Sequence, residues 1–150
     1  MARSCGNTCN EACNTAQSSN YEDKQGSSDK ANDGDQNSWT ATALMQNNWW
    51  RVDFGSARNI AGGTIWARGD CCTDSLDGFE LWIGNSPTYN GQDNVNCYHA
   101  TTTQHHSSPF THSFVCIGWG RYFFVHLPSN NVLSLAEVVV LESGKYNSKS

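Results

Sequence analysis

The feature that most constrains the fold is a two-residue alternation of apolar and polar side chains that recurs after residue 48. Apolar side chains occupy every second position in two runs, at residues 50–54 and 79–83. Successive side chains of a β-strand point to opposite faces, so this spacing predicts strands that are buried on one face. Gly, Asn, Asp and Pro separate the runs, which is typical of an antiparallel all-β domain.

Four further strands are expected at residues 59–67, 111–116, 121–127 and 137–141. The last two are apolar enough to be buried on both faces. Without heptads or a long amphipathic helix, the pattern favours a single antiparallel β-sandwich or jelly roll.

The length of 150 residues corresponds to one domain. The first forty residues are rich in Asn, Ser, Asp and Gly and are predicted to form loops. We expect a Cys-containing extension at residues 1–15, the domain at 16–142, and a polar tail at 143–150.

Charge and hydropathy argue against several classes of partner. The net charge is −5 and Lys and Arg do not cluster, so nucleic acid is not an expected partner. No apolar run is long enough for a membrane span, and no secretory signal is present in this chain. Membrane-surface binding would need exposed apolar tips such as Phe110 or Trp119, but tryptophans of a sandwich more often lie in the core. A membrane partner is therefore not expected, except through glycoconjugates.

Catalytic motifs are missing from the sequence. It contains no Gly-x-Ser-x-Gly motif, no phosphate-binding loop and no carboxylate pair suited to glycoside hydrolysis. The five histidines do not show the spacing of a zinc site. The sequence does not predict an enzyme.

Seven cysteines in so short a chain favour an oxidising, extracellular compartment. Because seven is odd, at least one thiol is free or pairs with another chain. Cys5, Cys9 and Cys13 are four residues apart and can line one side of a short helix. They leave open a homo-oligomer or a disulfide-linked assembly, since no second cluster completes a zinc site.

Several short motifs occur in a characteristic order: Ala-Gln-Ser-Ser at 16–19, Asp-Gly at 33–34, Trp-Trp-Arg-Val-Asp at 49–53, Arg-Gly-Asp-Cys-Cys at 68–72, Leu-Asp-Gly at 76–78 and Gly-Arg-Tyr at 120–122. Together they resemble the F-type, or fucose-binding, lectin domain, a discoidin-like β-sandwich. The resemblance covers about residues 16–141, and the adjacent cysteines after Arg-Gly-Asp are its most specific part. It implies a calcium-stabilised carbohydrate-binding module.

The sugar site of that family uses one His and two Arg, which donate hydrogen bonds to sugar oxygens. The resemblance places Arg68 at the first Arg position, Ala41 at the His position and Ser75 at the second Arg position. Each lost hydrogen bond to a charged donor is worth about 1.5–3 kcal/mol. We therefore expect altered or weak sugar specificity.

The resemblance also implies two disulfides, Cys71–Cys72 and Cys97–Cys116. The first would form a strained ring that supplies an apolar patch for the sugar. The alternative for the adjacent pair is two unlinked buried thiols.

Trp39 and Ala136 stand where the family commonly has a further cysteine pair, which predicts that packing replaces that disulfide. With Thr40 or Thr42, Trp39 can rebuild a pocket from aromatic stacking and hydroxyl groups. The alternative is that Trp39 only fills the space of the missing cysteine.

A structural Ca²⁺ site is the remaining implication of the resemblance. Asp33 and Glu137 would supply carboxylate oxygens, and such hard oxygen donors suit Ca²⁺. The full set of expected ligand residues is Lys30, Asp33, Asp35, Ser38, Ala136 and Glu137. The alternative for Asp33 to Asp35 is an ordinary turn.

Two functions follow. The leading hypothesis is a carbohydrate-binding module whose partner is a glycan, fucosylated glycans included. The alternative is an extracellular structural or protein-interaction module that has lost sugar binding, which the substitutions at Ala41 and Ser75 favour.

Overall fold

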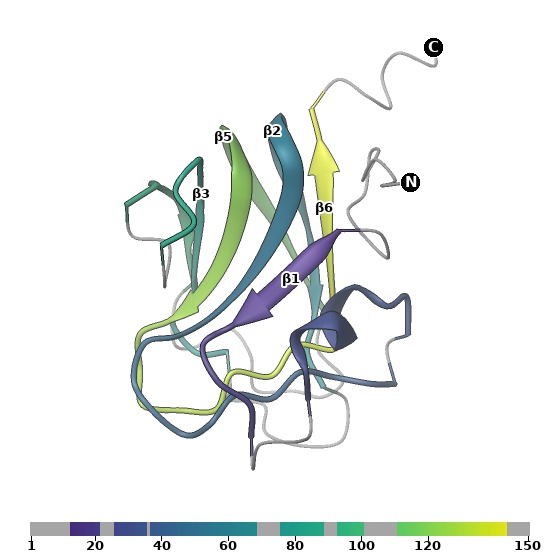
Figure 1. Cartoon of the computed structure of the whole chain (residues 1–150), viewed down its shortest axis with the longest axis vertical. Coiled ribbons are helices and arrows are strands. Elements are labelled where there is room, and N and C mark those ends of the chain that lie inside the picture. The colour runs from purple at the N-terminus through teal and green to yellow at the C-terminus, as the bar shows by residue number, and fades with distance from the viewer. Residues whose placement is uncertain are drawn as a thin grey trace.

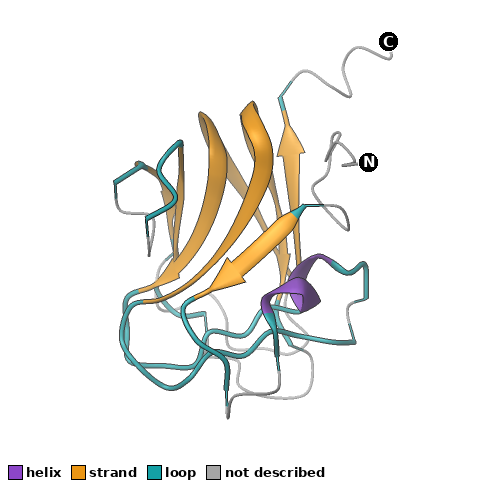
Figure 2. Ribbon diagram, viewed as in Figure 1, coloured by secondary structure: helices purple, strands orange, loops and turns teal. Residues whose placement is uncertain are grey.

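Figure 1 shows the computed structural model of the chain, which describes residues 13–21, 26–35, 37–68, 76–88, 93–100 and 111–143. Antiparallel strands make up almost all of its regular structure, which confirms the all-β prediction (Figure 2). Within these ranges no helix is long and apolar enough to cross a membrane. In chain order the elements are β1 (Asn14–Gln17), the 3-10 helix η1 (Ser28–Asn32), β2 (Asn48–Trp66), β3 (Glu80–Gly84), β4 (Val95–His99), β5 (Thr111–Leu127) and β6 (Glu137–Glu142).

Two long strands, β2 and β5, form the centre of the sheet and pair along their whole length. Their antiparallel register runs from Asn48 opposite Leu127 to Trp66 opposite Thr111. β1 pairs with the first half of β2, and β6 pairs with its second half. On the other side, β3 pairs with the second half of β5 and carries β4 at its outer edge.

The two long strands bend, so the sheet folds back over itself. The rings of Phe114 and Phe123, both on β5, stack with their centroids 5.8 Å apart. A straight strand would place residues nine positions apart about 30 Å from one another. Figure 1 shows β2 and β5 curving over at the top of the molecule, so both ends of each strand lie at the bottom. The result is the predicted sandwich, with two layers around one core.

The bend corrects the predicted strand boundaries. The strands predicted at residues 50–54 and 59–67 form one strand, β2, which ends at Trp66. The register of β2 shifts between Asp53 and Arg58, where Gly55 has a φ of +83° that other residues rarely adopt. The same holds for β5, which joins the strands predicted at 111–116 and 121–127.

Two strands were not predicted. β1 lies in the stretch that was expected to be loop, and it spans the boundary expected at residues 15 and 16. β4 was missed because its sequence, Val-Asn-Cys-Tyr-His, shows no clear apolar alternation. Both pair with longer strands, which supply the tertiary context that a short polar segment lacks.

The core lies between the two layers and contains the apolar faces predicted at residues 50–54 and 79–83. A disulfide between Cys97 on β4 and Cys116 on β5 joins the layers, with 4.9 Å between the Cα atoms, so this predicted pairing is confirmed. Cys13 is also disulfide-bonded. Cys5, Cys9 and the expected Cys71–Cys72 ring lie outside the described residues.

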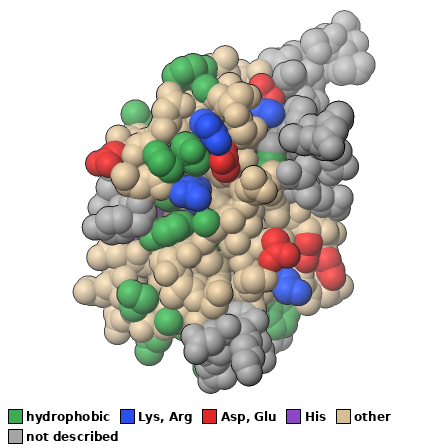
Figure 3. Space-filling view, in the orientation of Figure 1, with side chains coloured by type: hydrophobic (Ala, Val, Ile, Leu, Met, Phe, Trp, Pro, Cys, Tyr) green, Lys and Arg blue, Asp and Glu red, His purple; other side chains and the backbone are tan. Residues whose placement is uncertain are grey.

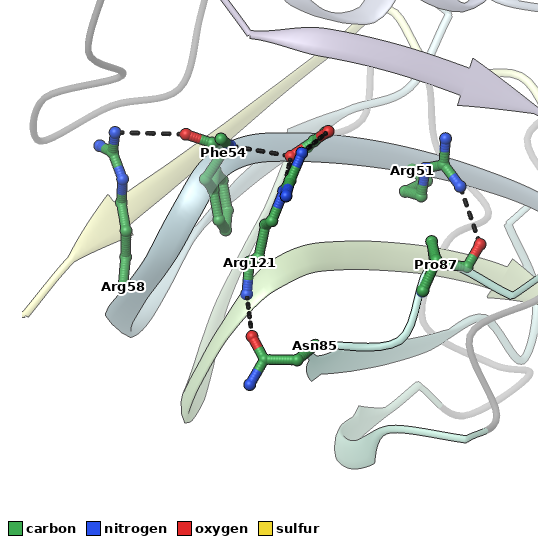
Figure 4. A network of polar contacts seen from close by, with 8 residues as sticks. Arg51, Phe54, Arg58, Asn85, Pro87 and Arg121 are labelled. Carbon is green, nitrogen blue, oxygen red and sulfur yellow. Dashed lines mark hydrogen bonds and ion pairs between the residues drawn. The ribbon is translucent and has the colours of Figure 1, made fainter.

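Residues 49–53 of β2, the Trp-Trp-Arg-Val-Asp motif, also form polar contacts on the outer face of the sheet (Figure 4). The Arg121 side chain donates two hydrogen bonds to the Asp53 carboxylate, at 2.7 and 3.0 Å. Arg51 donates to the carbonyl of Pro87 at 2.8 Å, which ties the segment after β3 to β2. Burial raises the pKa of Asp53, but the bonds from Arg121 and the Gly55 N–H outweigh it and leave that pKa below its ordinary value.

Candidate functional site

Loops at the bottom of the sandwich enclose a cavity of about 490 Å³. It lies at the end of the sandwich where β2 finishes and where the segment before β2 runs below the sheet (Figure 1). Sites for small ligands commonly have a volume of this order. The cavity is lined by Tyr21, Gly26, Lys30, Asn37, Ser38, Trp39, Ala41 and Arg68.

Arg68 and Trp39 form the most specific feature of this cavity. The guanidinium carbon of Arg68 lies 4.5 Å from the centre of the Trp39 ring, within the range of a cation–π contact. Both side chains are half-buried. The stack therefore places an aromatic side chain and a group that carries several fixed N–H donors side by side in the cavity wall.

Gln17 and Gly26 hold the cavity wall around Ala41. The Gln17 amide donates to the carbonyl of Gly26 at 2.9 Å, and the Ala41 N–H donates to the same carbonyl at 2.9 Å. Gly26 has a φ of +73°, and a Cβ at this position would collide with the backbone nitrogen of Ala41. Only glycine allows this close approach.

Asn48, at the start of β2, holds the neighbouring loops. Its side chain is fully buried, and its amide donates to the carbonyls of Ala43 and Asn131, each at 2.8 Å. Its side-chain oxygen accepts a hydrogen bond from the Ser18 hydroxyl at 2.7 Å. One buried amide therefore joins three segments below the sheet.

Thr40 and Thr42 do not contribute to the cavity, which contradicts the expectation that their hydroxyls could rebuild a sugar pocket. Both are fully buried, and their hydroxyls accept hydrogen bonds from the backbone N–H groups of Leu135 and Leu133, each at 2.9 Å. They face inward because alternate residues of an extended segment point to opposite sides. Trp39, one position earlier, faces the cavity.

The loop of the expected calcium site forms one wall of the cavity. The Ser38 hydroxyl donates to the Asp33 carboxylate at 2.7 Å, and the Asp35 N–H donates to the same carboxylate at 3.0 Å. The Gly34 N–H donates to the Glu137 carboxylate at 3.2 Å, across 103 residues of sequence. The structure therefore brings Asp33, Asp35, Ser38 and Glu137 together.

Two other expected ligand residues flank this loop. Lys30 lies on η1 and lines the cavity. Ala136 is fully buried next to Glu137, which is itself buried at the start of β6. No group of three or more His, Cys, Asp or Glu side chains is placed to hold a metal within the described part of the chain. A cation here would depend on hydroxyl and main-chain oxygens beside the two acids Asp33 and Glu137.

The fold and site can be compared with known proteins. A family model described as a NedA-like, galactose-binding domain of the F5/F8 type C group matches residues 30–125. The chain belongs to this family. Within the galactose-binding family, its sequence resemblance to F-type lectins is confirmed by fucolectin relatives.

Fucolectin-5 of Anguilla japonica is 38% identical over 110 residues, which are 72% of this chain and 57% of that protein. A fucolectin from the serum of Morone saxatilis, the striped bass, superimposes with a TM-score of 0.79 at 35% identity, over 87% of this chain and 46% of the other. A fucose binding module of Streptococcus pneumoniae gives a TM-score of 0.75 at 26% identity, over 92% and 96%. The chain thus spans about half the length of the curated fucolectins that it matches.

These relatives are lectins and sugar-binding modules, a non-enzymatic group, in agreement with the absence of catalytic motifs. In this member of the family, Arg68, Trp39 and Ala41 meet at one cavity, while Cys71, Cys72 and Ser75 lie outside the described residues. The site also contains residues that the sequence analysis missed.

Tyr21 and Asn37 line the cavity but were not predicted to do so. Tyr21 is one of two aromatic residues in the first forty, together with Trp39. An isolated aromatic residue in a polar segment was the one signal that could have identified it.

Proposed function

We propose that this domain binds a glycan in the cavity that Trp39 and Arg68 line together. The stack of the two side chains at 4.5 Å carries the proposal, because sugars are bound by aromatic faces and by fixed hydrogen-bond donors. The names of relatives support the same ligand class, since they include fucolectins and a fucose binding module.

The sugar preference should differ from that of a site with one His and two Arg. Ala41 lines the cavity at the expected His position and offers a methyl group where the family has an imidazole donor. The Tyr21 hydroxyl, the Lys30 amine and the Asn37 amide belong to the same lining and supply other donors. We infer a rebuilt site that is weak as a single copy, with fucosylated glycans among its candidate ligands.

A structural Ca²⁺ ion fits the adjoining loop. Its donors would be the carboxylates of Asp33 and Glu137, the Ser38 hydroxyl and main-chain carbonyls of Lys30, Asp35 and Ala136. An all-oxygen set that includes two acids suits Ca²⁺. Glu137 supports this assignment, because its carboxylate is buried beside the loop and accepts a hydrogen bond from the Gly34 N–H. The ion would tie the polar loop to β6 and so shape one wall of the cavity.

An extracellular location is consistent with these features. The Cys97–Cys116 disulfide favours an oxidising compartment, and one similar structure comes from serum. We infer that the protein works outside the cell, where glycans of cell surfaces are accessible.

A glycan array probed with the wild-type protein in Ca²⁺ tests the binding proposal. Selective binding that Arg68→Ala or Trp39→Ala abolishes is the expected result. Arg121→Ala is the matched control, because that arginine pairs with Asp53 on the outer face and not with the cavity. Unchanged binding by Arg68→Ala would refute the proposed site. A blank array for the wild type would instead support a structural or protein-interaction module.

Thermal unfolding with and without Ca²⁺ tests the ion. A ligand at a hundred times its Kd stabilises the folded state by about 2.7 kcal/mol. The midpoint should rise with Ca²⁺, and Asp33→Asn should remove the rise. Asp93→Asn, on the segment before β4, should leave it unchanged. A midpoint that does not respond to Ca²⁺ or to chelator would exclude this site.

A further inference from the structure

A row of exposed apolar side chains runs along the outer face of the layer that contains the first half of β5, the second half of β2, and β6. Three of them alternate along β5, where Val115 is 67% exposed, Ile117 75% and Trp119 58%. Leu141 on β6 is 42% exposed. We call these four residues the apolar stripe. The exposure of Trp119 contradicts the expectation that the tryptophans lie in the core.

The alternation of β5 explains why the stripe faces outward. Phe114 and Cys116 point into the core, so the residues between and beyond them point to solvent. Val115 and Leu141 both pair with Gly62 of β2, so they flank a residue that has no side chain. The stripe therefore spans three adjacent strands, with side chains from β5 and β6 on either side of Gly62 of β2.

The stripe lies far from the cavity. Trp119 pairs with Asn59 of β2, and Val115 and Leu141 pair with Gly62, whereas Arg68 follows the end of β2. Nine positions separate Asn59 from Arg68 and six separate Gly62 from it, which correspond to about 30 and about 20 Å of extended chain. A partner on the stripe would leave the cavity open.

Charged residues that border the stripe are paired within the chain. Arg58 forms an ion pair with Glu142 at 3.5 Å, next to Leu141. Arg121, two positions after Trp119, pairs with Asp53 at 2.7 Å. Figure 3 shows basic and acidic side chains next to one another among hydrophobic ones in the upper part of the molecule, and Figure 4 shows Arg58 and Arg121 from close by. The rim is therefore close to neutral.

We propose that the apolar stripe is the surface through which two copies of this chain associate. Its exposed area is on the order of 400 Å², comparable with the largest apolar patch of a typical monomer and about half of what each partner buries in a standard interface. An apolar patch with a neutral rim is complementary to itself. In a two-fold symmetric dimer, each copy presents the same patch, and the ion pairs on its rim stay within each copy.

The charges favour a second copy over a lipid surface. Arg58 and Arg121 are already paired with acids, and the chain carries a net charge of −5, so anionic headgroups would be repelled. Two copies repel one another as well, but salt screens this repulsion beyond about 10 Å. Since the contact itself is uncharged, added salt should strengthen the dimer.

The dimer would change how the cavity is used. With the stripe at one end of each copy and the cavity at the other, both cavities stay open and point away from the interface. Two weak sites on one particle bind a surface with many sugars far more tightly than either site alone. The dimer itself rests only on the stripe, so its test does not depend on sugar binding.

Sedimentation velocity over two orders of magnitude in protein concentration tests this proposal, with free thiols alkylated to exclude covalent linkage. Ile117→Thr combined with Trp119→Thr removes the apolar surface and keeps residues that favour strands. Val95→Thr on β4 is the matched control, because Val95 is 65% exposed but lies outside the stripe. Thermal unfolding of each variant checks that it is folded.

We expect a monomer–dimer equilibrium for the wild type and for Val95→Thr. Loss of two buried apolar side chains per copy should weaken the dimer at least roughly tenfold in the double variant. Three results would overturn the proposal: a wild type that stays monomeric, a double variant that still dimerises, or a dimer that salt dissociates. Capture of monomers by neutral phosphatidylcholine vesicles, lost in the double variant, would assign the stripe to lipid instead.

Discussion

Removal of the Cys97–Cys116 disulfide should destabilise the sandwich by a predictable amount. The bond closes a loop with a sequence separation of 19 and joins β4 to β5. A loop of this length restricts the unfolded chain by about 3 kcal/mol of free energy at 25 °C. Cys116 is fully buried, so replacement by alanine adds a small packing loss. Cys97→Ala with Cys116→Ala should therefore lower the free energy of unfolding by at least about 3 kcal/mol.

Urea unfolding followed by tryptophan fluorescence measures this loss, and the midpoint temperature should fall by about 6 to 12 °C. Cys97→Ala with Cys116→Val is the control, because valine restores most of the lost volume without the covalent link. If loop closure accounts for most of the loss in the free energy of unfolding, this variant should remain nearly as unstable as the double alanine variant. A valine variant as stable as the wild type would refute the reasoning and assign the effect to packing.

Three further predictions concern buried or paired polar groups. Burial lowers the pKa of His112 from 6.5, so the unfolded chain binds this proton more readily. The free energy of unfolding should fall as the pH drops below 6.5, and urea titrations of His112→Gln should show a weaker fall; an identical pH profile would contradict this. The pKa of Asp53 is also lowered, so its contribution is present at neutral pH and lost in acid, and Asp53→Asn should flatten the acid limb of the same profile. Thr40→Val should cost about 1–3 kcal/mol in urea unfolding, because the buried N–H of Leu135 loses its acceptor, and a loss no greater than that of exposed Thr111→Val would count against this account.

Alternation along the chain was enough to predict the core-facing residues of β2 and β3. It was not enough to predict where β2 and β5 end, because Gly55 has the same appearance in a sequence whether it forms a turn or a bulge. The structure shows the bulge, in which the chain changes direction while the pairing with β5 resumes at Arg58. Only the partner strand distinguishes these two outcomes.

The candidate site, too, was predictable from the sequence only in part. Arg68, Trp39 and Ala41 were expected from the resemblance to F-type lectins, and they line one cavity. The inward direction of Thr40 was not predicted, because the sequence does not show that this segment is extended and that it pairs with the distant Leu135. The exposure of Trp119 was missed because residue type alone does not report which face of a strand is covered.

The central position of β2 also determines when this protein can fold during synthesis. β2 pairs with β5 and β6, both of which follow it in the chain by more than forty residues. Until β5 leaves the ribosome, the apolar face of β2 and one of its edges have no native partner, and such strands are prone to aggregate. A high proportion of such distant contacts also slows folding, to between milliseconds and seconds for comparable β-sandwiches. The nascent domain therefore depends on its last third, and a truncation before β5 should leave a chain that chaperones retain and proteases remove.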